Sequence, residues 1–395
     1  MLLALTGGFT LSQAWRTIAA IMAPELQREF ALSTQQLGLF AGIFHFAFGA
    51  LQLVMGVGID LHGVRRTVLA AFPLTIVGAA LSALAPTFTW LLVGQVLIGI
   101  GCAPAFLVCT VFIARQFPVT QFASINGTVL GLGGVGMLLT GTPLAWLIEA
   151  SSWRGGFAAL GLLSVLAWLA IWRLVNEPAG PAHAGPHETL AGAVRGFGAL
   201  FAMPHTWGIV ALGAVTYAAF VTLRGLWLGP MLIERHDFSL VQAGNVAIVV
   251  SLASMVALPL WGRFDPGPAL RRRRIIEFTL VCAALFVLLA LGAGAAADIA
   301  LCIVYALLTG YIVYQYSDVR AAYASAMTGR ALALFTMSMF LGVALMQWLT
   351  GLVATVASAW GVPTFAAVLG AIAAMLAAGA LAFAWLPRPG GAHDR

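Results

Sequence analysis

The chain has 395 residues, of which 62% are hydrophobic and only 8% are charged. Soluble globular domains carry about 25% charged residues, so this composition excludes that class and indicates a membrane protein. The formal net charge is +6, and every positive side chain is an arginine, because the 19 basic residues include no lysine. All four cysteines lie inside hydrophobic stretches, so we expect no disulfide framework.

About a dozen apolar stretches follow one another, each of roughly 18 to 25 residues, which is long enough for a helix to cross about 30 Å of hydrocarbon. The first group is expected near Leu3–Met22, Leu37–Gly58, Thr67–Ala85, Trp90–Phe112, Ile125–Ile148 and Phe157–Leu174. The second group is expected near Trp207–Ile233, Ala243–Trp261, Ile275–Ala296, Ile299–Tyr316, Ala331–Val356 and Pro363–Leu386. The first stretch has an internal arginine and no basic leader, so we interpret it as a helix rather than as a cleaved signal peptide.

The arginines are distributed unevenly between the two sets of loops. If the N-terminus is cytoplasmic, only Arg28, Arg154 and Arg235 fall in loops on the outer side of the membrane. Because cytoplasmic loops are enriched in basic residues, this asymmetry predicts an even number of spans with both termini in the cytoplasm. The positive charge is therefore explained by membrane topology, and we expect no nucleic-acid partner.

A polar, proline-rich segment, Asn176–His205, separates the two groups of spans, and landmarks repeat across it. Arg16 is matched by Arg224 at an offset of 208 residues, and Asp60 and Arg115 are matched by Asp265 and Arg320 at an offset of 205. Such repetition indicates a duplicated six-helix unit. We therefore predict an all-α membrane protein with 12 transmembrane helices in two pseudo-symmetric bundles. The predicted parts are residues 1–175, a cytoplasmic linker at 176–206, and residues 207–395 with a short C-terminal tail.

The loop after the second expected span reads Gly56-Val-Gly-Ile-Asp60-Leu-His-Gly63-Val-Arg65-Arg66, and Gly262-Arg-Phe-Asp265 with Arg271–Arg274 is a degenerate copy after the eighth. The first loop resembles the signature of the major facilitator superfamily, although Leu61 stands where that family usually has arginine. The resemblance implies a secondary transporter of a bacterial inner membrane that works by alternating access. It also implies two cytoplasmic gates, formed by Asp60 with Arg65, Arg66 and Arg115 and by Asp265 with Arg320. The alternative is that these charges only hold the loops inside.

Two arginines lie within expected spans, Arg16 in the first and Arg224 in the seventh. A guanidinium cannot lose its charge, so at bilayer depth it costs several kcal/mol unless a cavity or an anion receives it. Gln13 lies near Arg16, and Tyr217 and Trp227 provide an aromatic setting for Arg224. We predict that a small organic anion, a carboxylate or an organophosphate, binds between the two arginines. Organic-anion and organophosphate carriers of the superfamily resemble this arrangement. The alternative is that each arginine reaches the outer interface or a backbone carbonyl.

Other polar groups could complete such a site. Tyr311 and Gln315 share one face of the tenth expected span and offer hydrogen bonds to a substrate. His45 is the titratable group of intermediate pKa in mid-span, so it is a candidate for proton coupling. The alternative for His45 is a neutral side chain that is hydrogen-bonded between packed helices.

The remaining predictions concern chemistry and partners. We find no enzyme constellation, expect no cofactor, and interpret Cys102 and Cys109 as a small-residue packing face rather than a metal site. The expected partners are an anionic substrate, the lipid bilayer and, through His45, protons, and the chain is expected to act as a monomer. Symport, antiport and uniport all remain open. A second reading, a proton-driven efflux antiporter for drugs or metabolites, would usually need a buried mid-span carboxylate, and the sequence shows none in a clear mid-span position.

Overall fold

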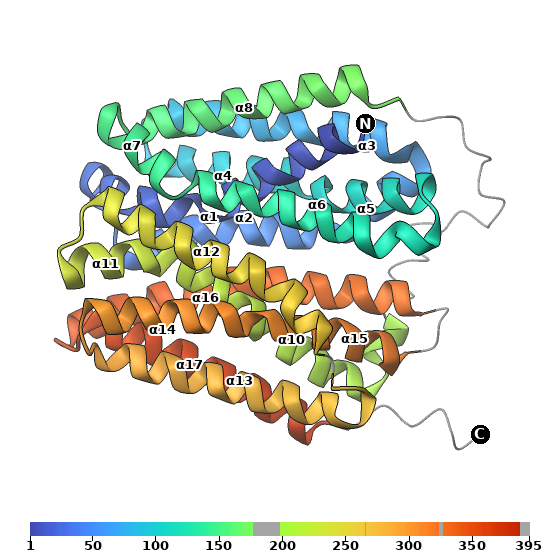
Figure 1. Cartoon of the computed structure of the whole chain (residues 1–395). Helices are drawn as coiled ribbons and strands as arrows, with labels where there is room; N and C mark the ends of the chain where they lie inside the picture. The colour runs from blue at the N-terminus through green and yellow to red at the C-terminus, as the bar shows by residue number, and fades with distance from the viewer. Residues whose placement is uncertain (177–197, 265, 324–326, 388–395) are drawn as a thin grey trace.

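The computed structural model of the chain describes residues 1–176, 198–264, 266–323 and 327–387, and it leaves out the side chains of residues 60, 114, 119–124, 126 and 127. Within these ranges the regular structure is helical throughout (Figure 1). Most of the predicted linker, residues 177–197, lies outside the described residues.

The N-terminal half contains eight labelled helices. They are α1 (Leu2–Phe30), α2 (Thr34–Ala50), α3 (Gln52–Ala83), α4 (Phe88–Cys102), α5 (Ala105–Gln116), α6 (Val119–Leu139), α7 (Thr142–Ala150) and α8 (Trp153–Leu174). Some expected spans consist of two consecutive helices, because α2 continues into the start of α3 and α4 continues into α5. Helix α3 is kinked at Gly63, whose φ of 82° is a left-handed value that glycine adopts without strain.

The C-terminal half is described from α10 onward. It contains α10 (Pro204–Thr222), η1 (Leu223–Trp227), α11 (Leu228–His236), α12 (Leu240–Arg263), α13 (Pro268–Leu291), α14 (Ala295–Leu308), η2 (Thr309–Tyr311), α15 (Ile312–Ala322), α16 (Thr328–Ala359) and α17 (Thr364–Trp385). The segment η1 is one π-helical turn, which joins α10 and α11 into a single long helix. Such turns interrupt the regular ladder of hydrogen bonds and are frequent at functional sites.

The expected spans agree with these helices. Eleven of the described helical segments are long and apolar enough to cross a membrane, and they match the second to twelfth expected spans. The first expected span is α1, whose 29 residues would measure about 43 Å at the rise of an α-helix. Helix α1 contains four charged residues, Arg16, Glu25, Arg28 and Glu29.

The helices run side by side in two groups, with the blue-to-green helices of the N-terminal half on one side and the yellow-to-red helices of the C-terminal half on the other (Figure 1). We call the end where α8 ends and α10 begins the linker end. The opposite end, with the connections α1–α2, α7–α8 and α11–α12, is the far end. The two halves meet where α2 packs on α16, where α1 packs on η1, and where α6 and α7 pack on α12. We call this contact the seam.

The seam is tightest toward the far end. A Cβ atom on Gly42 of α2 would lie 2.9 Å from the carbonyl oxygen of Ala344 of α16, so only glycine permits this approach. Gly244 of α12 lies equally close to the backbone of Thr142 of α7. Closer still to the far end, Thr34 and Thr355 share a hydrogen bond of 3.1 Å between their hydroxyl groups. Small residues let membrane helices approach closely, and here they close the two halves together at the far end.

Candidate functional site

Arg16 lies in the middle of α1 and is only 7% exposed. Its guanidinium carbon is 4.5 Å from the ring centroid of Phe48 of α2 and 4.7 Å from that of Phe340 of α16. One amino group donates a long hydrogen bond of 3.4 Å to the hydroxyl of Ser12, and Nε has no partner among the described residues. The charge is therefore held between two aromatic rings, one from each half, and keeps an unused donor.

Arg224 lies in the π-helical turn η1 and is completely buried. Its Nε donates to the carbonyl oxygen of Ala247 at 3.1 Å and to the hydroxyl of Ser251 at 2.9 Å, both on α12. Its Nη2 donates to the carbonyl oxygen of Met137 on α6, at 2.8 Å across the seam. The Nη1 group has no partner within the described part of the chain. The sequence suggested aromatic surroundings for this arginine, but its contacts are polar, and the aromatic pair surrounds Arg16 instead.

The two arginines occupy equivalent places in the two halves. Arg16, on the first span, contacts the second and eleventh spans, and Arg224, on the seventh, contacts the eighth and fifth. Each one therefore touches its own half and the opposite half, as a pseudo-twofold relation between the halves requires. Among the described residues, neither arginine has a carboxylate within ion-pair distance. Two positive charges are thus buried at the seam without a compensating negative charge from the described part of the chain.

The other predicted substrate residues are distributed around the C-terminal half and α1. Tyr217 of α10 packs edge-on against Phe340, with ring centroids 5.5 Å apart, so it adjoins the aromatic setting of Arg16. Gln13 is half-buried, one turn before Arg16. Gln315 is buried and accepts a hydrogen bond of 3.0 Å from Thr216 through Oε1.

Two further predicted residues have hydrogen bonds inside the C-terminal half. The indole of Trp227 donates to Thr350 at 3.0 Å. The hydroxyl of Tyr311 is 2.9 Å from that of Thr279 on α13. In this conformation the indole N–H of Trp227 and the hydroxyl of Tyr311 therefore both have hydrogen-bond partners within the C-terminal bundle.

His45 lies on α2, one turn before Phe48, and is 1% exposed. Its Nδ1 is 3.1 Å from the carbonyl oxygen of Ala41, and its Nε2 has no hydrogen-bond partner in the described ranges. Gln347 of α16 lies close enough to His45 for the two side chains to interact, yet neither of its amide atoms makes a hydrogen bond of ordinary geometry. Sequence reasoning did not find Gln347, because nothing in α16 alone shows that it meets α2.

The described residues of the two predicted gates lie at the linker end. The side chain of Asp60 and the whole of Asp265 fall outside the described residues, so the two carboxylates of the gate prediction cannot be placed. Arg65 donates to the carbonyl oxygen of Trp172 at 3.0 Å. Arg66, Arg115 and Arg320 have exposed side chains.

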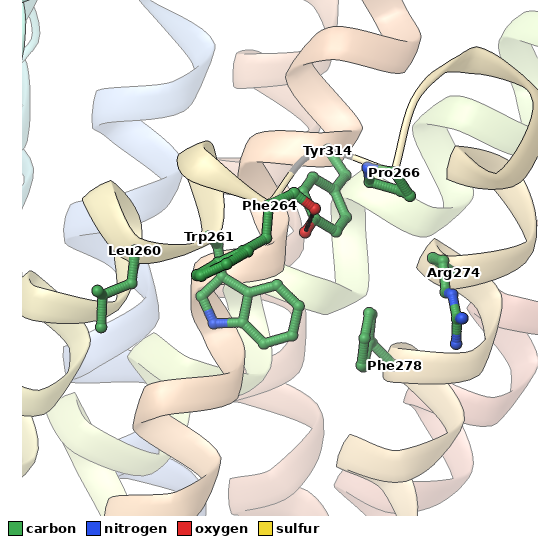
Figure 2. A pocket seen from close by; sticks show the side chains of 7 residues that line it. All are labelled: Leu260, Trp261, Phe264, Pro266, Arg274, Phe278 and Tyr314. Carbon is green, nitrogen blue, oxygen red and sulfur yellow. Dashed lines mark hydrogen bonds between the residues drawn. The ribbon is translucent and has the colours of Figure 1, made fainter.

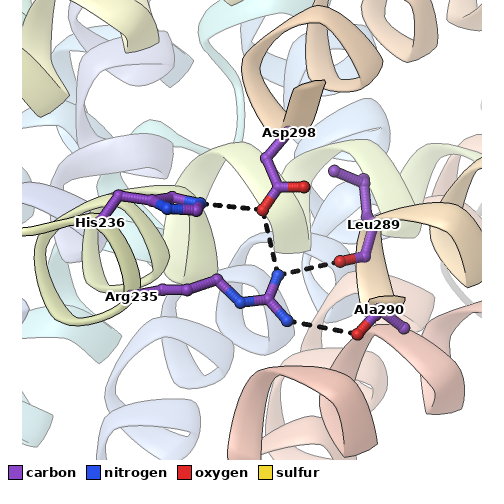
Figure 3. Close-up of polar contacts among 5 residues, drawn as sticks. All are labelled: Arg235, His236, Leu289, Ala290 and Asp298. Atoms are coloured by element: carbon purple, nitrogen blue, oxygen red, sulfur yellow. Dashed lines mark hydrogen bonds and ion pairs between the residues drawn. The ribbon is translucent and has the colours of Figure 1, made fainter. Parts of the chain in front are cut away.

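A buried ion cluster at the far end was not predicted (Figure 3). Asp298, in the first turn of α14, is fully buried, and its Oδ2 accepts from Arg235 at 3.1 Å and lies 2.9 Å from Nε2 of His236. Arg235 also donates to the carbonyl oxygens of Leu289 and Ala290 at the end of α13. The cluster ties the end of α11 to the turn between α13 and α14, and all of its members belong to the C-terminal half.

A cavity of about 500 Å³ opens at the linker end of the C-terminal half (Figure 2). Its lining comes from α12, α13, α15 and the connection after α12, and includes Trp261, Phe264, Phe278, Tyr314 and Arg274. No predicted substrate residue lines it. In the described part of the chain, no group of three or more His, Cys, Asp or Glu side chains is placed to hold a metal ion.

Comparison with known proteins agrees with the fold. The family model described as Major Facilitator Superfamily matches residues 4–328. The hexuronate transporter of Bacillus subtilis is 24% identical over 324 residues, which cover 76% of this chain and 75% of that protein. A probable sulfoacetate transporter of Cupriavidus necator is 26% identical over 157 residues, which cover 40% of this chain and 36% of that protein.

Solved structures share the whole architecture. A bacterial homologue of the human lysosomal transporter Spinster, in an inward-facing and occupied conformation, superimposes with a TM-score of 0.74 at 19% identity. The match covers 97% of this chain and 95% of that one. The family model spans most of the chain, and the two-bundle fold recurs in a transporter homologue over nearly its full length. This chain, a multi-pass membrane protein and not an enzyme, therefore belongs to the Major Facilitator Superfamily of transporters.

Proposed function

We propose that this transporter moves a small organic anion, a carboxylate or an organophosphate, across a bacterial inner membrane. The observation that carries the proposal is the pair of buried arginines without carboxylate partners in the described residues, Arg16 and Arg224. Each uncompensated charge costs about 3 kcal/mol at the centre of a membrane span. An anionic substrate would supply the missing negative charge, and the unused Nε of Arg16 and Nη1 of Arg224 are donors that it could engage.

The proposed cycle is alternating access between the bundles of residues 1–175 and 207–395, joined by the linker 176–206. With the linker end and both termini in the cytoplasm, the described conformation is closed toward the outside. Opening the far end must break the contacts of both arginines across the seam, because Phe340 and Met137 belong to the halves opposite Arg16 and Arg224. An anion can drive this conformational change only if it binds to the two conformations with different affinities.

The names of two similar proteins support the substrate class, since hexuronate and sulfoacetate are both organic anions. We place Gln13, Tyr217 and Gln315 at the periphery of the site and keep Tyr311 and Trp227 as residues that a rearranged cavity would expose. The Asp60 and Asp265 gates, a monomeric state, and His45 as the group that couples protons as a symporter belong to the same proposal. The alternative function is proton-driven efflux of drugs or metabolites.

The test is a ligand screen with the purified full-length protein. Thermal stability is measured with D-glucuronate, sulfoacetate and glycerol 3-phosphate, and with a lipophilic cation, tetraphenylphosphonium. We expect stabilisation by at least one anion, and loss of that shift in Arg16→Gln and Arg224→Gln at near-normal expression. Arg154→Gln is the matched control, because the contacts of Arg154 with Glu29, Ala85 and Trp153 all lie within its own half. Stabilisation by the cation alone would favour efflux and reject the anion proposal.

A further inference from the structure

Four buried polar atoms beside the seam make no hydrogen bond of ordinary geometry within the described part of the chain. They are Nε of Arg16, Nε2 of His45, and both Oε1 and Nε2 of Gln347. His45 is 1% exposed and Gln347 is 0% exposed, so water at the surface does not satisfy them. Leaving a buried polar group unsatisfied is costly, and native structures contain few such groups. Several in one place indicate that a polar partner belongs there.

These atoms come together from both halves. His45 and Gln347 lie close to each other on α2 and α16, and the charge of Arg16 is near enough to act on His45. Phe48 and Phe340, which enclose the guanidinium, belong to the same two helices. The orphaned atoms therefore adjoin the site of the proposed function.

The hydrogen-bonding types of these atoms restrict the ligand. Nδ1 of a neutral His45 donates to the carbonyl oxygen of Ala41, which leaves Nε2 as an acceptor. Gln347 offers two N–H donors and a carbonyl acceptor, while Arg16 offers only donors. A plain carboxylate or an ionised sulfonate can accept from Arg16 but has no hydrogen to donate to His45. A hydroxyl group can donate to His45 and accept from Gln347.

We propose that His45 and Gln347 form a hydroxyl-recognition subsite beside Arg16, which selects polyhydroxylated carboxylates, the chemical class of sugar acids, over carboxylates without hydroxyl groups. This inference rests on the proposed function, because Arg16 must hold the carboxylate. Since one residue comes from each half, the subsite is complete only while α2 and α16 lie together. A hydroxylated substrate therefore binds best to the conformation that is closed at the far end.

The test compares two ligands with similar six-membered rings and the same charge, D-glucuronate and cyclohexanecarboxylate, by calorimetry on the purified full-length protein. For the wild-type protein we expect at least tenfold tighter binding of D-glucuronate. In Gln347→Leu, which keeps the side-chain size, we expect that preference to fall about tenfold while cyclohexanecarboxylate binds as before. Gln95→Leu is the matched control, because Gln95 is equally buried on α4 and also has an amide nitrogen without a partner in the described residues.

The outcomes separate the two proposals. If the wild-type protein binds neither ligand nor any anion of the screen, the proposed function fails and the subsite falls with it. If it binds both ligands equally, or if Gln347→Leu keeps the wild-type preference, the anion site stands and the hydroxyl subsite is refuted. Should Gln347→Leu fail to fold, His45→Leu decides the question, because it removes the acceptor from the other half and must also abolish the preference.

Discussion

The contact between Arg224 and Met137 should help to hold the far end of the transporter closed. The Nε bonds of Arg224 lie within the C-terminal half and persist when the halves separate, whereas the Nη2 bond to Met137, at 2.8 Å, crosses the seam. A hydrogen bond from a charged donor contributes about 1.5–3 kcal/mol. We therefore expect Arg224→Gln, which removes the charge and shortens the reach, to shift the ligand-free equilibrium toward far-end opening by roughly 10- to 150-fold.

Distances between spin labels across the far end measure this shift. Labels on Arg28→Cys and Ser358→Cys would report on the ends of α1 and α16, one in each half, and both positions are exposed. The four native cysteines are buried, so they need not be replaced before labelling. The protein without the Arg224 substitution should give one short distance, and Arg224→Gln should add a longer population. Arg154→Gln, with contacts inside one half, should leave the distribution unchanged.

A distance distribution in Arg224→Gln that matches that of the parent protein would refute this reasoning. The Met137 contact would then be too weak to bias the halves, and the closure would depend on helix packing through Gly42 and Gly244 alone. Substitution of the glycines would become the informative experiment.

Three further predictions follow from named contacts. Arg16→Lys keeps the charge but loses the planar group that lies between Phe48 and Phe340, so uptake of the identified anion into vesicles should fall at least tenfold rather than mildly. Asp298→Ala leaves Arg235 and His236 without their shared carboxylate, so stability should fall by about 3 kcal/mol, measured as a lower unfolding temperature. Glu277→Ala, which breaks a partly exposed ion pair, should change little. The hydrogen bond from Arg154 holds the pKa of Glu29 below its usual range, so the stabilisation by this pair is complete at neutral pH and is lost as the pH falls below about 4. The difference in unfolding temperature between wild type and Arg154→Gln should accordingly be small at pH 7 and decrease further as the pH falls below about 4, while the hydrogen bond from Arg154 to the carbonyl oxygen of Ala85 remains. A difference that does not decrease in acid would contradict the assignment.

The fold followed from the sequence because membrane burial imposes long apolar helices that hydropathy reveals. Arg16 and Arg224 were found for a related reason, since a charge inside such a helix is costly and therefore conspicuous. Their partners could not be predicted. Phe340 and Gln347 reach the site only because α16 packs on α2, about 300 residues earlier in the chain, and no periodicity within α16 specifies that neighbour. The only signal was the row of glycines on α2, Gly42 and Gly49 among them, which marks close approach without naming the other helix.

The partners of the charged residue Asp298 could not be predicted from the sequence either. The sequence places it at the start of a helix, where an exposed acidic residue is common. Its complete burial depends on Arg235 and His236, which lie more than sixty positions earlier and reach it through the fold. The π-helical turn at Arg224 was also unpredictable, because the segment Leu223–Trp227 has no proline and no local pattern that distinguishes it from an ordinary α-helix. The gate predictions for Asp60 and Asp265 stay predictions.

The three arginines at the far end differ from the two at the seam, Arg16 and Arg224, in having carboxylate partners. Arg28, Arg154 and Arg235 each form an ion pair with a carboxylate, with distances of 2.7, 2.6 and 3.1 Å. At the far end the chain therefore supplies acidic partners for these three arginines, even at exposed positions where an ion pair contributes little. At the seam, where an unpaired charge costs most, the described residues supply none. A fixed structural charge would gain most from a carboxylate at that depth, so its absence there is best explained by an anion that arrives and leaves.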